Sequence, residues 1–167
     1  MRGRAVLTGR RTYPMTKANV KLKSASKGNQ YAAIPIRFTE QGQLEVLLVT
    51  SRGSKKWLVP KGWPIPKLAA HASAAREAFE EAGIEGAIRP RSPIGSYQYF
   101  KRVDANVLQI KVKVFILWAA RQLETWPEQA ERLTKWFSPE DAADAVEEKQ
   151  LATLLLGLPD MVRLKGA

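Results

Sequence analysis

The chain has 167 residues, of which 45% are hydrophobic and 26% charged, with no cysteine and a net charge of +11. This composition predicts one globular domain, and the missing cysteines exclude disulfides and cysteine-ligated zinc. No apolar run approaches the roughly 18 residues of a membrane helix, so no membrane association is expected, and a cytoplasmic location suits a cysteine-free chain. The positive surplus favours anionic partners such as nucleotides, polyphosphates or RNA.

Residues 1–28 are basic and lack a sustained apolar period, which predicts a poorly ordered arm before a domain over residues 29–167. No acidic residue precedes Glu40. The basic residues before it supply most of the net charge: Arg2, Arg4, Arg10, Arg11, Lys17, Lys21, Lys23, Lys27 and Arg37. The arm is interpreted either as a solvated tail or as a segment that binds RNA.

Beyond the arm, strand-forming and helix-forming segments alternate. Strands are predicted over residues 31–38, 44–50, 57–60, 96–101, 107–119 and 135–137. Helices are predicted over residues 68–82, from Ser138 onward and over residues 151–158, with a loop over 61–67. Ser138 is the expected N-cap of its helix, because a proline and two acids follow it. Strands on both sides of one central helix indicate an α/β (α+β) layered domain.

The central helix carries three glutamates on one face. Glu77, Glu80 and Glu81 stand at i, i+3 and i+4, where like charges repel one another. Such a cluster of hard oxygen donors suits magnesium or manganese, and magnesium commonly bridges carboxylates to substrate phosphates. The alternative is a solvated acidic face with Arg76 and Glu80 as an ordinary i,i+4 pair.

Small residues on the other face predict that this helix lies close to a sheet; they are Ala70, Ala74, Ala75 and Ala78. Gly83 occupies a position typical of a left-handed helix end. Gly62 permits a tight loop that brings backbone carbonyls toward the same cation.

Residues 62–84 resemble the Nudix box, G-x5-E-x7-R-E-U-x-E-E-x-G-U, where U is an aliphatic residue. Arg76, the three glutamates, Gly83 and Ile84 are in register with it. Two positions depart: Ala78 is smaller than the usual aliphatic residue, and Leu68 stands in place of the first glutamate. Residues 46–52 and 56–62 are similar to the diphosphoinositol polyphosphate phosphohydrolase branch of the family, with similarity from about residue 31 to the helix after residue 138.

The resemblance implies an α/β/α sandwich with a central mixed sheet flanked by helices. It also implies magnesium-dependent hydrolysis of a phosphoanhydride bond, with Mn²⁺ as an alternative ion. In this interpretation Glu77, Glu80 and Glu81 bind the metal, the Lys61 carbonyl is a further ligand, and Arg76 orients the carboxylates.

Residues outside the box complete the predicted site. Nudix enzymes often use another glutamate as base or ligand, and Glu128 and Glu131 lie in the segment expected to supply it; either is otherwise a solvated loop acid. Cations suited to phosphate binding are predicted at Arg52, Lys55, Lys56 and, more weakly, Arg37.

Three functions follow from these observations. The leading one is hydrolysis of a small, anionic nucleoside-diphosphate-linked, dinucleoside polyphosphate or diphosphoinositol polyphosphate substrate. The second is an RNA 5′ pyrophosphohydrolase that holds RNA with the basic arm. The third is a non-catalytic Nudix-fold binding or regulatory module, which Leu68 favours and the three glutamates oppose. The sequence makes no prediction of oligomeric state.

Overall fold

The computed structural model describes residues 27–165. The arm predicted over residues 1–28 lies outside this range except for Lys27 and Gly28, which begin the first strand. The strands are β1 (Lys27–Phe38), β2 (Leu44–Thr50), β3 (Trp57–Leu58), β4 (Lys61–Gly62), β5 (Ile84–Ile88), β6 (Gly95–Val103), β7 (Asn106–Gln122) and β8 (Thr134–Phe137). The helices are α2 (Ala70–Ala82), α3 (Pro139–Ala145) and α4 (Lys149–Lys165).

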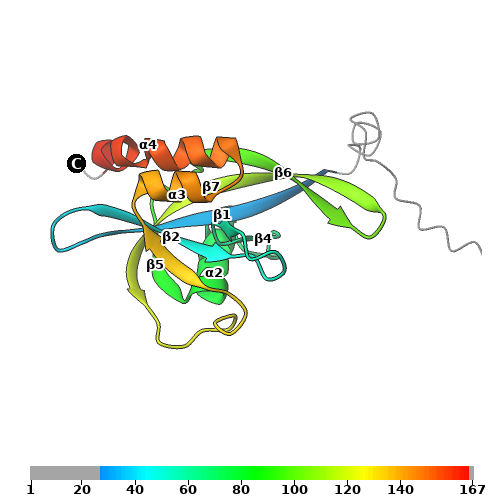
Figure 1. Ribbon diagram of the computed structural model, residues 1–167, viewed down its shortest axis with the longest axis horizontal. Helices are drawn as coiled ribbons and strands as arrows, with labels where there is room; N and C mark the ends of the chain where they lie inside the picture. The colour runs from blue at the N-terminus through cyan, green and yellow to red at the C-terminus, as the bar shows by residue number, and fades with distance from the viewer. Residues whose placement is uncertain (1–26, 166–167) are drawn as a thin grey trace, which may run out of the picture.

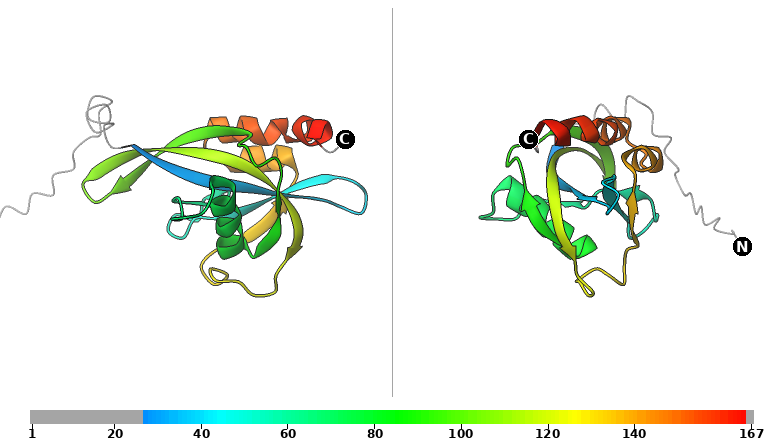
Figure 2. Two further views of the ribbon diagram at one scale, coloured as in Figure 1. Left: turned by 180° about the vertical axis from the view of Figure 1, so that it is seen from behind. Right: turned by 90° about the vertical axis from the view of Figure 1, so that its left-hand side faces the viewer.

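The strands form one mixed sheet of eight strands with the central order β3-β2-β1-β7-β5. β4 pairs with β1, β6 with β7, and β8 with β2. Among the strands of residues 27–165, only β1 and β7 pair in parallel; the other pairs are antiparallel. Helices α3 and α4 lie on one side of the sheet and α2 on the other, as Figures 1 and 2 show. The predicted mixed sheet flanked by helices is therefore confirmed.

Two apolar cores hold the helices to the sheet. On the side of α3 and α4, leucines of α4 pack with β-branched residues such as Ile34 and Ile116. On the other side, Ala74 and Ala78 of α2 pack against Phe115 and neighbouring strand residues. These alanines are fully buried, which confirms the expectation that the helix lies close to the sheet. The glutamates of α2 consequently point toward its remaining faces.

Several element boundaries differ from the prediction. β5 was not predicted, because its sequence Ile-Glu-Gly-Ala-Ile contains only two strong strand formers. Its pairing with β7 shifts register between Glu85 and Gly86, where the Trp118 carbonyl lies close to the glycine. α4 runs well beyond residue 158 and contains Pro159. Within residues 27–165, no helix combines the length and apolar character needed to cross a membrane.

Candidate active site

The C-terminal end of α2 is fixed by backbone and aromatic contacts. Gly83 has φ 67°, so it is the left-handed C-cap that the sequence predicts, and its N–H donates to the Phe79 carbonyl at 2.9 Å. The Trp126 ring packs against Gly83, and its Nε1 donates to the Glu81 carbonyl at 3.2 Å. These contacts hold residues 124–133, the loop before β8, against the last turn of α2.

Gly62 brings the β4 backbone next to the Glu77 carboxylate. A Cβ added at Gly62 would overlap the carboxylate oxygens of Glu77, so only glycine permits this approach. Lys61 and Gly62 are held in place by pairing with Ala32 and Tyr31 of β1. The glycine loop and the glutamate helix therefore meet at Gly62 and Glu77. Among the described residues, the Glu77 carboxylate has no hydrogen-bond or ion-pair partner.

A buried arginine, Arg132, connects two of the predicted acids. Its Nη2 lies 3.3 Å from Glu81 Oε1 and 3.2 Å from Glu128 Oε1, and its Nη1 donates to the Thr50 carbonyl at 3.0 Å. The Arg132 side chain is 8% exposed and the Glu81 side chain 5%. Sequence reasoning missed Arg132; its only local sign is the i,i+4 spacing from Glu128, in a segment interpreted as a loop.

Among residues 27–165, one carboxylate oxygen of the buried Glu81 lacks a hydrogen-bond partner. Its Oε2 is buried and has no hydrogen-bond partner. Burial raises the pKa of Glu81 to about 8, although the Arg132 guanidinium acts in the opposite direction. Burial also raises the pKa of Glu77, with further contributions from the charges of Glu80 and Glu128. The acids therefore lie close enough to disfavour one another's ionisation.

The carboxylates of Glu77 and Glu81 suit a hard divalent cation, because such ions bind oxygen ligands. The positive charge of an ion would also offset the negative charges that these carboxylates carry close together. In the arrangement of residues 27–165, however, no three acidic, histidine or cysteine side chains converge into a ready metal site. Glu80 is engaged elsewhere, since its Oε1 accepts from Arg76 Nε at 2.9 Å. An ion held by all three glutamates would be bound by Glu80 through its second carboxylate oxygen, with the Arg76 pair intact.

The structure distinguishes the two candidate acids outside the box. The Glu128 N–H donates to the Glu80 carbonyl at 3.0 Å, so Glu128 lies directly beside α2, with its side chain 20% exposed. Glu131 is 49% exposed, and within the described part of the chain its carboxylate pairs only with Arg52, at 3.8 Å. Glu128 is thus part of the acidic cluster, and Glu131 lies at its outer edge.

The predicted basic residues divide between three places. Arg52 lies 3.7 Å from Glu128, so it reaches the acidic cluster and remains 63% exposed. Lys55 donates to the Glu131 carbonyl at 3.1 Å, and Lys56 pairs with Glu147 at 3.0 Å. Arg37 is not brought to the site. It lies in the second half of β1, paired with Glu45 at 2.7 Å and stacked over the Trp136 ring at 4.0 Å.

A cavity of about 680 Å³ lies beside the acidic cluster, between β3, β6 and the connection from α3 to α4. Its walls combine cations, aromatic rings and two acids: Lys56, Lys61, Lys101, Arg102, Trp57, Tyr99, Glu147 and Glu148. Lys61 connects the two regions, because its backbone adjoins Gly62 and its Nζ stands 4.7 Å from the Tyr99 ring. Burial lowers the pKa of Lys61, and the negative charge of Glu81 opposes this effect.

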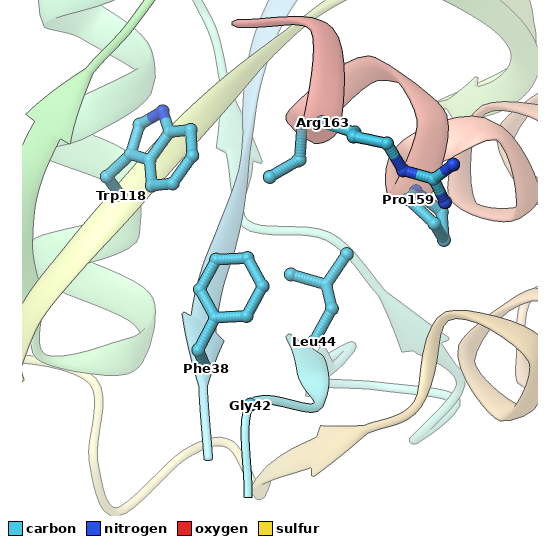
Figure 3. A pocket seen from close by; sticks show the side chains of 7 residues that line it. Phe38, Gly42, Leu44, Trp118, Pro159 and Arg163 are labelled. Carbon is cyan, nitrogen blue, oxygen red and sulfur yellow. The ribbon is translucent and has the colours of Figure 1, made fainter. Parts of the chain in front are cut away.

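A second cavity, of about 590 Å³, has a different character. It is lined by Phe38, Leu44, Trp118 and residues of α4, and Figure 3 shows these side chains around it. Arg163 is the only charged residue in its wall. Phe38 lies seven residues along β1 from Tyr31, the partner of Gly62, which is about 23 Å in a strand. This cavity is therefore remote from the acidic cluster.

Leu68, which replaces the usual glutamate of the box, precedes α2. It is 46% exposed, and its N–H donates to the Ile65 carbonyl at 3.1 Å. The substitution therefore falls in the turn that leads into the helix, and the three later glutamates keep their positions on α2.

Comparisons with known proteins agree with this arrangement. The family model for the NUDIX domain matches residues 28–155. Nudix hydrolase 16, mitochondrial, of Arabidopsis thaliana is 31% identical over 113 residues, which cover 64% of this chain and 61% of that protein. Diphosphoinositol polyphosphate phosphohydrolase 2 of Rattus norvegicus is 31% identical over 124 residues, covering 72% and 65%. The chain thus spans less than two thirds of the length of each of these relatives.

Solved structures share the fold. The C. elegans Ap4A hydrolase in a binary complex superimposes with a TM-score of 0.61 at 21% identity, covering 81% of this chain and 98% of that one. Identity at this level establishes the common architecture and leaves the substrate open.

Proposed function

Since this chain belongs to the Nudix family, we propose that it is a divalent-metal-dependent hydrolase of a phosphoanhydride bond in a small, highly anionic substrate. The candidate substrates are nucleoside-diphosphate-linked compounds, dinucleoside polyphosphates and diphosphoinositol polyphosphates. The observation that carries the proposal is the buried Glu81, whose Oε2 lacks a partner beside Glu77 and Glu128. A protein without such chemistry gains nothing from burying a carboxylate in this state.

Glu77, Glu80 and Glu81 would hold the ion, with the Lys61 carbonyl as a further donor, and Mg²⁺ is the expected metal. When bound, the ion supplies positive charge that acidifies a water molecule and offsets the charge of the phosphates. Arg76 supports Glu80 through its ion pair. A non-catalytic module has little reason to keep these repelling carboxylates together.

Glu128 is the proposed proton acceptor for the attacking water. Its backbone is tied to α2 through the Glu80 carbonyl, and its carboxylate is held by Arg132. Arg132 is a positioning residue, because it fixes both Glu81 and Glu128 from the buried side of the cluster. Glu131 is the weaker candidate, since its carboxylate is 49% exposed and pairs with the exposed Arg52.

The cavity beside the cluster is the proposed substrate site. Four cations in its walls favour a phosphorylated ligand: Lys56, Lys61, Lys101 and Arg102. Arg52 stands at the acidic cluster and is exposed enough to contact a phosphate.

A cytoplasmic location stays a prediction, which fluorescence microscopy of the tagged protein tests.

The test is a substrate screen with Mg²⁺, using the wild type and the double variant Glu80→Gln/Glu81→Gln. The double variant is expected to lose metal-dependent turnover of any substrate that the wild type cleaves. Glu124→Gln/Glu140→Gln makes the same chemical change at two exposed positions outside the cluster and is expected to keep turnover. Unchanged turnover in a folded Glu80→Gln/Glu81→Gln protein would defeat the proposal.

A further inference from the structure

On the α2 side of the sheet, the face formed by β1, β7 and β6 extends past the part that α2 covers. Residues directly opposite one another in paired strands point to the same side. The register therefore defines three rows on the α2 side: Tyr31, Lys113 and Ser96; Asn29, Lys111 and Gln98; Lys27, Gln109 and Phe100. These nine residues are called the open sheet face.

None of the helices described within residues 27–165 covers the open sheet face. α2 packs farther along the same strands, over Ala33, Phe115 and Leu117. Figures 1 and 2 show the β6–β7 hairpin and the start of β1 projecting past α2 and past α4. Six of the nine residues are exposed, and the other three are partly exposed.

The open sheet face carries positive charge with no acid to balance it. Lys27, Lys111 and Lys113 belong to its rows, and none of the nine residues is acidic. Among the described residues, these three lysines form no salt bridge. Unpaired cations spaced along neighbouring strands suit a ligand with repeated negative charges.

Aromatic and amide side chains stand between the cations. Phe100 is 56% exposed at one corner, and Tyr31 is partly exposed at the opposite corner. Gln109 Nε2 donates to Gln98 Oε1 at 2.7 Å, which orders two amides in the middle of the face. An exposed phenylalanine among lysines suits stacking of a nucleic-acid base.

The size of the face fits a short single strand. The five residues of β1 from Lys27 to Tyr31 span about 13 Å, and three strands span about 10 Å across. In known RNA-binding domains, the open face of a four-stranded sheet stacks two or three bases.

The open sheet face begins at the acidic cluster. Tyr31 is opposite Lys113 on one side and Gly62 on the other. Gly62 is the residue against which the Glu77 carboxylate lies. A chain lying on the open sheet face therefore reaches the candidate metal site directly at Tyr31.

We propose that the open sheet face binds a single-stranded nucleic acid, with its bases over Phe100 and Tyr31 and its phosphates at the lysines. The binding itself stands apart from catalysis. Its direction toward Glu77 rests on the proposed function, because it places the end of a bound strand at the same site.

Binding of a fluorescein-labelled eight-nucleotide oligouridine, and of its oligothymidine counterpart, is measured by anisotropy on the full chain over a range of salt concentrations. Phe100→Ala is expected to weaken binding at least about fivefold without changing the salt dependence, because stacking is lost. Lys111→Glu/Lys113→Glu is expected to lower the slope of log affinity against log salt by about 1.4 or more, since two phosphate contacts disappear. The control Arg91→Glu/Lys135→Glu makes the same change in net charge at exposed positions outside the face.

Equal loss in the control and in Lys111→Glu/Lys113→Glu would overturn the proposal, because it would mean that net charge alone drives binding. A Phe100→Ala protein that binds the oligonucleotide like the wild type would also overturn it. So would a Lys111→Glu/Lys113→Glu protein that loses binding to phosphatidylserine vesicles but keeps its binding to the oligonucleotide. Glu80→Gln/Glu81→Gln is expected to keep oligonucleotide affinity. Its loss of turnover therefore tests the proposed function separately from this surface.

Discussion

Arg132 is expected to be the main electrostatic support of the acidic cluster. Replacing it with methionine keeps most of the side-chain volume but removes the guanidinium from Glu81, Glu128 and the Thr50 carbonyl. Removing one partner of a buried ion pair costs about 3–5 kcal/mol, because the other charge is left without compensation. For a chain of this size, that loss lowers Tm by roughly 6–20 °C.

The cost is expected to depend on pH, because Glu81 is ionised in the native wild type only above its raised pKa of about 8. Urea unfolding of metal-free protein at pH 8.5 should show the full loss for Arg132→Met. At pH 5, where Glu81 holds a proton in both proteins, the loss should be smaller. The loss at pH 8.5 should be smaller between Glu81→Gln and Arg132→Met/Glu81→Gln than between the wild type and Arg132→Met, since the Glu81 charge is absent from both proteins of the first pair.

The control is Arg163→Met. Arg163 and Asp160 are 79% and 83% exposed and 3.8 Å apart, so this variant should stay within about 0.5 kcal/mol of the wild type. The reasoning would be refuted if Arg132→Met lost less than about 1 kcal/mol at pH 8.5, or if Glu81→Gln gave no relief.

Three further predictions concern the same cluster. Gly62→Ala should lower kcat about 100-fold in a steady-state assay, because the added Cβ displaces the Glu77 carboxylate. The control Gly53→Ala adds a Cβ where the space is open and should match the wild type in the same assay. The free energy of unfolding of the metal-free wild type should fall as pH rises from about 4.5 to about 8, by up to about 1.4 kcal/mol per pH unit. The reason is that the native state holds the Glu81 proton more tightly than the unfolded chain does. In urea titrations, Glu81→Gln should flatten this pH dependence. Glu128→Gln should lower kcat about 100-fold or more and Glu131→Gln less than about twofold, and equal effects of the two in a kinetic comparison would contradict the assignment of the proton acceptor.

Much of the fold follows from local sequence patterns. β2 has the predicted bounds, and α2 begins two residues later than expected, because alternating apolar residues and an alanine-rich run determine these elements. Ser138 caps α3 through its side chain, which accepts from the Asp141 N–H at 3.1 Å. The parallel pairing of β1 with β7 joins residues about 80 positions apart, and nothing in the local sequence specifies it.

The candidate site also combines features that the local sequence predicts with features that depend on tertiary contacts. The glutamate spacing on α2 and the approach of Gly62 to Glu77 depend on short-range geometry, so the sequence predicts them. Arg132 becomes part of the cluster only because residues 124–133 fold back on α2, with Trp126 against Gly83. That contact is tertiary, which is why the sequence left Glu128 and Glu131 equivalent.

The central claim is that the glutamates of α2 bind a divalent ion beside Gly62, and calorimetric titration of metal-free protein with MgCl₂ at pH 8.5 tests it most directly. The wild type and Glu124→Gln/Glu140→Gln are expected to give saturable heat, which Glu77→Gln/Glu81→Gln should abolish while remaining folded. Absence of saturable heat in the wild type, or the same heat in Glu77→Gln/Glu81→Gln, would contradict the account.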